Sequence, residues 1–341
     1  MKGRMIVLDH LGRREAAALL VDGKLDDLLI DDDSAPRPGT IYRAVADRGM
    51  KGQGGMILKI PGGTAWLRNA SGLKAGEVLL VQVTGVGEGG KAVPVTDRVL
   101  FKSRYAIVTP GAPGINVSRQ IRDEEERGRL LAIAEDEMEE GPHGLILRSA
   151  AEGAPEDEIA EDISAMRDLA AKVTADAEGP PELLAEGDGP HLLAWREWSA
   201  PTVVTKPGSF EREGVLDQID ALRRAEVALG EGFMSVEATR ALVAVDVNTG
   251  GDTTPAAALK ANLAAARVLP RQLRLRGLGG QIVVDFASMS KGHRKQLEQS
   301  LRDSFRSDPI ETSLVGWTAM GLYELSRKRE RAPLAHLLGE D

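Results

Sequence analysis

The chain has 341 residues, of which 42% are apolar, with a formal net charge of -9 and no cysteine. This length is sufficient for two or three domains, each with its own core. The lack of cysteine excludes disulfides, thiolate zinc sites and cysteine nucleophiles and suits a reducing compartment, so a cytoplasmic protein is expected. The apolar runs are far shorter than the roughly 20 residues that cross a bilayer, so no membrane association is expected.

The charge is unevenly distributed. Residues 123–188 contain 21 acidic and 5 basic residues, a net of -16, which leaves +7 for the rest of the chain. Residues 271–331 contain 12 basic and 7 acidic residues, a net of +5. Such asymmetry permits a basic face to meet phosphates while an acidic region faces solvent, although a solvated acidic segment explains the same counts.

The N-terminal part begins with an apolar stretch, residues 1–8, that predicts a β-strand. Residues 16–31 are apolar enough for a helix or strands, and the turn-rich residues 31–39 predict a domain boundary. Residues 40–101 then form five short β-rich pieces separated by glycines, which suggests a small barrel. Oligonucleotide-binding barrels of this size bind single strands, and Trp66 and Lys91 are the candidate contacts; a barrel without a ligand remains an alternative.

The middle of the chain is acidic and largely helical. A helix is expected from about Asp123, followed by a short buried strand that ends at Arg148 and Ser149. A second acidic helix over residues 155–178 is closed by Pro180 and Pro181. Residues up to Gly230 are expected to pack beside the N-terminal piece.

The strongest signal lies in the last third. The runs ALVAVDVNTGGD and GQIVVDFASM predict two buried strands that end near Asp246 and Asp285. Between them, Thr253 or Thr254 can cap a helix that Pro255 opens. A strand, a helix and a strand in this order predict a right-handed crossover with parallel neighbouring strands, so both aspartates are expected at one sheet edge.

Two carboxylates at one edge repel each other, and Mg²⁺, which prefers one or two carboxylates with water and phosphate oxygens, offsets their charge. A bound metal of this kind assists hydrolysis of a phosphodiester by water. Asn248 lies two residues after Asp246, on the same side of an extended strand, and can orient water or phosphate. An aspartate that ends a strand also commonly caps a turn, so a structural role for the pair remains open.

Basic residues surround this region. Arg271 and Arg274 lie in the expected helix and are candidates for contacts with an RNA backbone. Basic residues near a helix C-terminus also interact favourably with the helix dipole without any ligand, which is the alternative explanation.

The segments ALVAVDVNTGGD, NLAAARVLPRQLRLRGLGGQIVVDFASM and GLYELSRKR closely resemble the catalytic region of the ribonuclease E/G family, over about residues 230–329. The resemblance implies a magnesium-dependent endoribonuclease, with Mn²⁺ as a possible substitute metal. Asp246 and Asp285 are implied as the metal-binding aspartates, and Asn248 as the asparagine that assists them.

The same resemblance implies an α+β multidomain fold in five parts. An RNase H-like piece (1–37) is interrupted by an oligonucleotide-binding S1-type β-barrel (38–102) and a 5′-sensor region (103–180). A shortened second RNase H-like piece (181–229) follows, and then a DNase I-like α/β catalytic subdomain (230–341).

Several family positions are altered. The sensor's arginine and threonine match Arg148 and Ser149, but a further sensor arginine falls near Glu311, where a carboxylate would repel a phosphate. In the barrel, the substrate-contacting aromatic and lysine match Trp66 and Lys91, whereas a second aromatic position is aliphatic, around Ile57. The family's zinc link requires a cysteine pair, so any homo-oligomer is expected to form without that zinc link.

The resemblance implies hydrolysis of phosphodiester bonds in single-stranded RNA during RNA processing and decay, rRNA processing included, leaving a 5′-phosphate and a 3′-hydroxyl, and this is the predicted function. Two alternatives from other classes are a catalytically weak or inactive RNA-binding factor with the same fold and a metal phosphohydrolase that acts on small molecules. The first would bind RNA without a magnesium-dependent product. The second would show little RNA affinity and no steep salt dependence.

Overall fold

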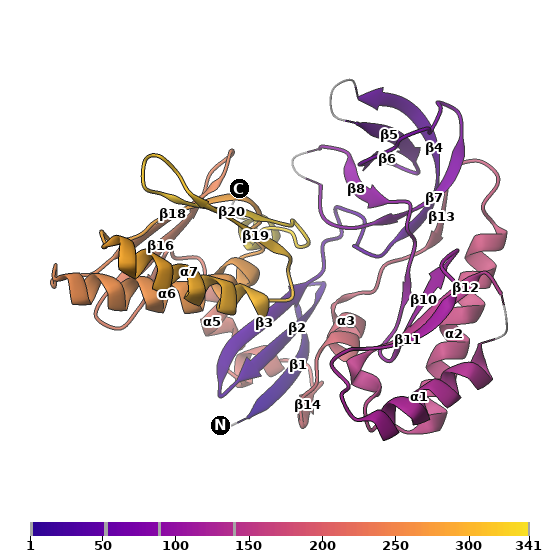
Figure 1. Ribbon diagram of the computed structural model, residues 1–341, viewed down its shortest axis with the longest axis horizontal. Coiled ribbons are helices and arrows are strands. Elements are labelled where there is room, and N and C mark those ends of the chain that lie inside the picture. The colour runs from indigo at the N-terminus through magenta and orange to yellow at the C-terminus, as the bar shows by residue number, and fades with distance from the viewer. Residues whose placement is uncertain (1–2, 51–53, 88–89, 139–140, 340–341) are drawn as a thin grey trace. The chain divides into compact units, whose positions relative to one another are not determined.

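The computed structural model describes residues 3–50, 54–87, 90–138 and 141–339. The chain forms two compact units (Figure 1). Unit 1 comprises Met1–Asp33 and Ser199–Asp341, and unit 2 is the intervening segment Ser34–Trp198. The five-part division expected from the sequence is finer than these two units and stays a prediction.

The first sheet of unit 1 has the strand order β14-β1-β2-β3. Its strands are Arg4–Leu11 (β1), Arg14–Val21 (β2), Lys24–Ile30 (β3) and Thr202–Val204 (β14), and two helices, Ser209–Arg212 (α4) and Val215–Ala221 (α5), accompany it. The first predicted strand is confirmed from Arg4 onward; Met1 and Lys2 lie outside the described residues. The ambiguous stretch after it folds as β2 and β3, because Asp22 and Gly23 both adopt a positive φ and form a tight hairpin turn.

The residues that follow unit 2 pack on this sheet, as expected. Phe210, Val215 and Ile219 join Met5 and Val7 in one hydrophobic core.

The second sheet of unit 1 has six strands in the order β15-β16-β17-β18-β20-β19. The strands are Glu226–Ala228 (β15), Phe233–Ala238 (β16), Val243–Asn248 (β17), Gly280–Asp285 (β18), Thr312–Trp317 (β19) and Tyr323–Arg327 (β20). The helices are Pro255–Leu275 (α6), Lys291–Arg306 (α7) and Leu334–Leu338 (α8). Figure 1 shows α6 and α7 side by side along one face of the sheet, where their apolar residues share a core with β16, β17, β18 and β20.

Unit 2 contains a closed barrel of five strands. They are Ile41–Met50 (β4), Gly55–Ile60 (β5), Gly63–Leu67 (β6), Val78–Val83 (β7) and Val93–Thr96 (β8). Pairing runs from β4 through β5, β6, β8 and β7 and returns to β4, which closes the ring. The five-strand barrel predicted from the sequence is therefore confirmed.

The rest of unit 2 is a four-stranded sheet with helices. Its strands, in the order β11-β12-β10-β9, are Phe101–Lys102 (β9), Ala106–Pro110 (β10), Gly114–Val117 (β11) and His143–Leu147 (β12). The other elements of the unit are Glu124–Glu137 (α1), Ser149–Ala151 (η1), Glu156–Ala175 (α2), Glu182–Ala185 (β13), which pairs with β4, and Pro190–Glu197 (α3). Both predicted acidic helices are confirmed, and Asp123 caps the first of them.

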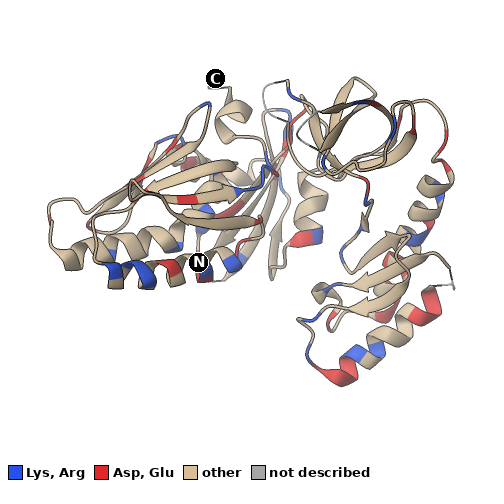
Figure 2. Cartoon of the chain, turned by 45° about the horizontal axis from the view of Figure 1, so that its top comes forward, with Lys and Arg blue, Asp and Glu red and all other residues tan. Residues whose placement is uncertain are grey.

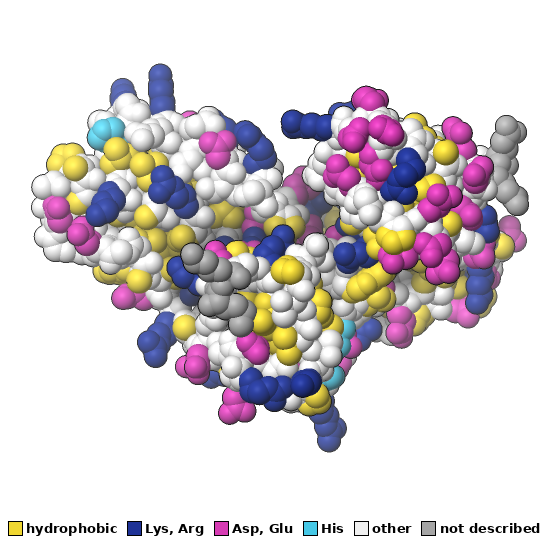
Figure 3. Space-filling view, turned by 90° about the horizontal axis from the view of Figure 1, so that it is seen from below, with side chains coloured by type: hydrophobic (Ala, Val, Ile, Leu, Met, Phe, Trp, Pro, Cys, Tyr) yellow, Lys and Arg dark blue, Asp and Glu magenta, His cyan; other side chains and the backbone are white. Residues whose placement is uncertain are grey.

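The acidic residues of this region lie largely on the surface of α1 and α2. Figure 2 shows red residues along α1, and acidic side chains gather over α1 and α2 at the right of Figure 3. Apolar residues on the opposite sides of the two helices, among them Leu130, Ile159 and Ile163, are fully buried against the sheet. The charge therefore reflects a solvated helical surface.

The structure confirms a mixed α+β chain with a small barrel. Whether the sheets of unit 1 are RNase H-like and DNase I-like in detail stays a prediction. In the described part of the chain, no helix is long and apolar enough to cross a membrane.

Candidate catalytic edge and nucleic-acid contacts

Asp246 and Asp285 lie side by side near the C-terminal ends of β17 and β18, the two central strands of the six-stranded sheet. Strands β17 and β18 are parallel neighbours, and their register pairs Asp246 directly with Asp285. Neighbouring strands are about 4.8 Å apart, so the two backbone positions are close. The predicted strand–helix–strand order with parallel neighbouring strands is confirmed, with α6 connecting the two strands and Thr254, rather than Thr253, as its cap. The right-handed sense of this crossover stays a prediction.

Both aspartates lie on the face of the sheet that α6 and α7 do not cover. Side chains alternate between the faces of a strand. Val245 and Val247 are buried in the core shared with the helices, whereas Asp246 is exposed, and Val284 and Asp285 differ in the same way. The two carboxylates therefore point to the same open face, where solvent and a ligand have access to them.

Asn248 shares this face with Asp246. Its amide nitrogen Nδ2 lies 3.5 Å from Oδ2 of Asp246, a long hydrogen bond, and its side chain is exposed. The predicted arrangement of two carboxylates and one amide on one side of neighbouring strands is thus present.

These groups suit a cation that takes few protein ligands. In the described ranges, no group of three or more His, Cys, Asp or Glu residues could hold a metal ion. Mg²⁺ commonly uses only one or two carboxylates and takes its other oxygens from water and a substrate phosphate. Two carboxylates without a basic partner on the same strands fit that donor set.

A buried asparagine holds the backbone that follows Asp285. Asn262 of α6 is 0% exposed, donates from Nδ2 to the carbonyl oxygen of Ala287 at 2.8 Å, and accepts from the Ala287 N–H at 3.0 Å. This residue was not among those predicted from the sequence. Its signal was present, because a polar residue between Ala261 and Leu263 on the apolar side of a helix requires a buried partner.

Aromatic residues support the same end of β18. Phe286, Trp317 and Tyr323 form a cluster with ring centroids 5.1 to 6.4 Å apart. The guanidinium of Arg294 lies 4.2 Å from the centroid of the Trp317 ring, whose Nε1 donates to Oε1 of Glu298 at 2.8 Å. This cluster fixes the β19–β20 hairpin and the start of α7 beside the two aspartates.

The two predicted arginines of α6 differ in environment. Arg274 is 7% exposed and forms ion pairs with Asp308 and, at 3.2 Å, with Asp27. Arg271 lines a pocket with Lys24 and Arg267. The donors of Arg274 are therefore used within unit 1, and Arg271 is the one with donors available to a ligand.

Trp66 and Lys91 belong to neighbouring parts of the barrel, because Trp66 lies on β6 and Lys91 comes two residues before β8, the strand that pairs with β6. Trp66 of β6 is half-buried, pairs across the sheet with Ile57, and lies over Gly55, where an added Cβ would collide with the indole ring. Lys91 is exposed just before β8. A role for both in RNA contact stays a prediction.

Arg148 lies in an ion cluster, next to the exposed Ser149. Its Nη1 donates to the carbonyl oxygens of Ser103 at 2.5 Å and Arg104 at 3.3 Å, and its Nη2 pairs with the carboxylate of Glu197 in α3. Burial by itself would raise the pKa of Glu197, but the charges of Lys102, Arg148 and Arg196 lower it to about 2. Glu197, which was not among the residues predicted from the sequence, therefore occupies the position that an anion would take at Arg148.

This cluster predicts an acid-sensitive unit 2. Because the pKa of Glu197 is near 2 when folded and near 4.5 when exposed, its contribution to stability is complete above about pH 4.5 and is lost as the pH falls toward 2. We expect Glu197→Gln to flatten the pH dependence of the unfolding midpoint in this window, and the exposed Glu161→Gln on α2 to leave it unchanged. Urea denaturation at pH 3, 4 and 6, followed by circular dichroism, measures the unfolding midpoint. If the midpoint of Glu197→Gln depends on pH as steeply as that of the unaltered protein, the prediction is contradicted.

Comparison with known proteins relates this chain to ribonucleases E and G. The sequence pattern of the Ribonuclease E/G family matches residues 101–206 and 201–330. Ribonuclease G of Escherichia coli (strain K12) is 30% identical over 311 residues, which cover 78% of this chain and 62% of that protein. Ribonuclease E of a Nostoc species is 30% identical over 306 residues, which cover 77% of this chain and 44% of that protein.

The chain thus spans less than two thirds of the length of these relatives. Its fold and site define a mixed α+β protein with a small closed barrel and a pair of in-register aspartates at the edge of a second sheet. With the family pattern matched over about two thirds of its residues, the chain belongs to the Ribonuclease E/G family.

Proposed function

We propose that this chain is a magnesium-dependent endoribonuclease that hydrolyses single-stranded RNA and leaves a 5′-phosphate and a 3′-hydroxyl. The observation that carries the proposal is the direct pairing of Asp246 with Asp285 on the open face of the sheet, in a member of this family. The names of the relatives, Ribonuclease G and Ribonuclease E, support RNA as the substrate.

Asp246 and Asp285 would hold the metal, with Asn248 orienting a water or a phosphate oxygen. When bound, Mg²⁺ supplies charge neutralisation at the phosphate and lowers the pKa of a coordinated water; Mn²⁺ is a possible substitute. The chain's own residues fix the positions of the two carboxylates through the β17–β18 register and the two hydrogen bonds between Asn262 and Ala287, one donated by each residue.

The test is incubation of the purified protein with a fluorescent, internally unstructured RNA, with and without Mg²⁺, beside Asp246→Asn. Internal cleavage that requires both Mg²⁺ and Asp246 supports the proposal. RNA binding without a magnesium-dependent product would replace it with the RNA-binding factor, and absence of both binding and cleavage would favour a small-molecule phosphohydrolase.

Asn262 gives a second prediction. Asn262→Leu removes both hydrogen bonds to Ala287, which we expect to cost roughly 1–3 kcal/mol of stability. Because a group that orients a metal ligand typically contributes 10- to 100-fold, we expect kcat to fall by about that factor and the Mg²⁺ concentration for half-maximal activity to rise.

The matched control is Leu269→Ala on the same helix, a fully buried residue whose truncation costs about 2–5 kcal/mol. Assayed below its melting temperature, this variant should keep the normal Mg²⁺ dependence. If Asn262→Leu behaves like Leu269→Ala in the Mg²⁺ titration, Asn262 has only a structural role.

The ion cluster around Arg148 bears on recognition of the RNA 5′ end. Its guanidinium donors are used by Glu197 and by backbone carbonyls, and Glu311, near the expected position of a further sensor arginine, pairs with Lys328 at 2.5 Å. We infer that a 5′-monophosphate gives little acceleration. Cleavage rates of 5′-monophosphorylated and 5′-hydroxyl forms of one RNA should therefore be similar, and a rate at least about tenfold higher on the monophosphorylated RNA would refute this inference.

A further inference from the structure

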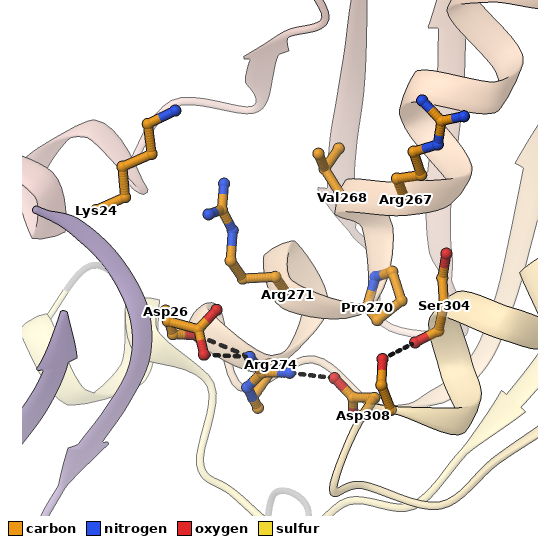
Figure 4. A pocket seen from close by; sticks show the side chains of 10 residues that line it. Lys24, Asp26, Arg267, Val268, Pro270, Arg271, Arg274, Ser304 and Asp308 are labelled. Carbon is orange, nitrogen blue, oxygen red and sulfur yellow. Dashed lines mark hydrogen bonds and ion pairs between the residues drawn. The ribbon is translucent and has the colours of Figure 1, made fainter. Parts of the chain in front are cut away.

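A pocket of about 460 Å³ lies in unit 1, away from the aspartate pair. It is formed by the C-terminal half of α6, the end of α7 and the start of β3 (Figure 4). The lining residues are Lys24, Asp26, Arg267, Val268, Pro270, Arg271, Arg274, Ser304, Ser307 and Asp308. Its volume falls within the range of ligand-binding pockets, roughly 300–1,000 Å³.

The pocket has an excess of positive charge. Four lining side chains are cationic and two are carboxylates, a net of +2. Both carboxylates already have partners: Asp26 lies 3.6 Å from Arg274, and Asp308 pairs with Arg274 and with Arg327 at 2.9 Å. In Figure 4 these ion-paired groups form a row, and Lys24, Arg267 and Arg271 extend from it to one side.

The remaining three cations have no anionic partner among the described residues. In the part of the chain that the structure describes, none of Lys24, Arg267 and Arg271 forms an ion pair or a side-chain hydrogen bond, and the buried Nε of Arg271 lacks a partner altogether. An arginine Nε–H removed from water without an acceptor is costly. The cationic side chains of Lys24, Arg267 and Arg271, which line the pocket, are the groups that an oxyanion there would meet.

The helix dipole does not explain this arrangement. The effect is confined to the last turn of a helix, where α6 has Arg274. Arg267 and Arg271 lie earlier in α6, and Lys24 comes from a strand, so their convergence on one pocket has a different reason.

From these observations we propose that the pocket binds a phosphate group of the RNA backbone. The proposal rests on the proposed function and adds a second contact for the same substrate. Helix α6 begins at Pro255, at the end near the aspartates, and Arg271 lies sixteen residues further along. This separation is roughly 24 Å along the helix axis. The pocket also lies on the helix side of the sheet, so it anchors RNA outside the cleaved region and contributes to binding rather than to chemistry.

The experiment measures RNA binding in an Asp246→Asn background, which prevents cleavage. Lys24→Gln, Arg267→Gln and Arg271→Gln are combined, with Arg302→Gln as the matched control, because Arg302 is an exposed cation of α7 that does not line the pocket. Fluorescence anisotropy with a long single-stranded RNA is recorded over a range of salt concentrations. The single variant Arg267→Gln, at an exposed position, is measured as well, so that the proposal can be tested even if the combined variant misfolds.

We expect the combined variant to bind about tenfold more weakly and its salt slope to fall by about 0.7 for each RNA phosphate that is no longer neutralised. Arg267→Gln should show a smaller change in the same direction, and in the cleaving protein these substitutions should raise KM and leave kcat unchanged. RNAs with 5′-hydroxyl and 5′-phosphate ends should respond alike if the ligand is an internal phosphodiester. If the pocket binds inorganic phosphate but the pocket substitutions do not change the affinity for RNA, the assignment of the ligand to RNA is overturned.

Affinity and salt slope equal to those of Arg302→Gln would also overturn the proposal. In that case magnesium-dependent cleavage by the unaltered protein would still support the proposed function. If the unaltered protein neither cleaves nor binds RNA, the proposed function and the proposal for the pocket are both refuted.

Discussion

Asp285→Asn is expected to reduce the rate of RNA cleavage by at least about 10³-fold, because in the proposed mechanism the amide removes one of the two carboxylates that would hold the metal. Asp285 is exposed and pairs in register with Asp246, so the substitution leaves the core intact. Unfolding free energy should change by no more than about 0.5 kcal/mol. The measurement compares single-turnover cleavage of a labelled RNA and urea denaturation for both proteins.

The matched control for this prediction is Asp303→Asn, which removes the same charge from an exposed position on α7. It should retain cleavage within about twofold, as expected for a screened surface charge. Near-normal cleavage by Asp285→Asn, or by Asp246→Asn, would show that the aspartate pair does not carry the chemistry.

Asp308→Ala is expected to destabilise unit 1 by about 3–5 kcal/mol, because it leaves buried positive charges without a partner. The side chain of Asp308 is 1% exposed, and it pairs with Arg274 and with Arg327, whose side chain is 0% exposed. Asp308 also accepts the backbone N–H of Ile310 at 3.0 Å. Removing the carboxylate therefore affects α6, β20 and the connection after α7 together.

Urea denaturation measures this destabilisation as a lower midpoint. Asp303→Ala is the control, because its ion pair with Arg306 is long, at 3.5 Å, and both side chains are exposed, so a cost below about 1 kcal/mol is expected. A cost for Asp308→Ala no larger than for Asp303→Ala would mean that Arg274 and Arg327 find other partners or water.

The parts of the fold that the sequence predicted correctly are those with clear local patterns of apolar and turn residues. The apolar runs that end at Asp246 and Asp285 are too short for helices and are joined by a capped helix, which restricts them to parallel neighbouring strands. The five strands of the barrel were each bounded by glycines and turn residues. By contrast, residues 16–31 had an apolar content compatible with either a helix or strands, and a turn with positive φ at Asp22 and Gly23 resolved this stretch as a hairpin.

The sequence by itself determined the candidate carboxylate pair, Asn248 on the same strand side and the concentration of acidic charge on two helices, because each depends on residue type and short-range periodicity. Only the tertiary structure decided which arginines are available, since Arg274 meets Asp27 from a strand about 250 positions earlier while Arg271 faces a pocket. The same holds for Glu197 against Arg148 and for Asn262 against Ala287. These contacts join residues distant in the chain, and packing rather than local propensity selects such partners.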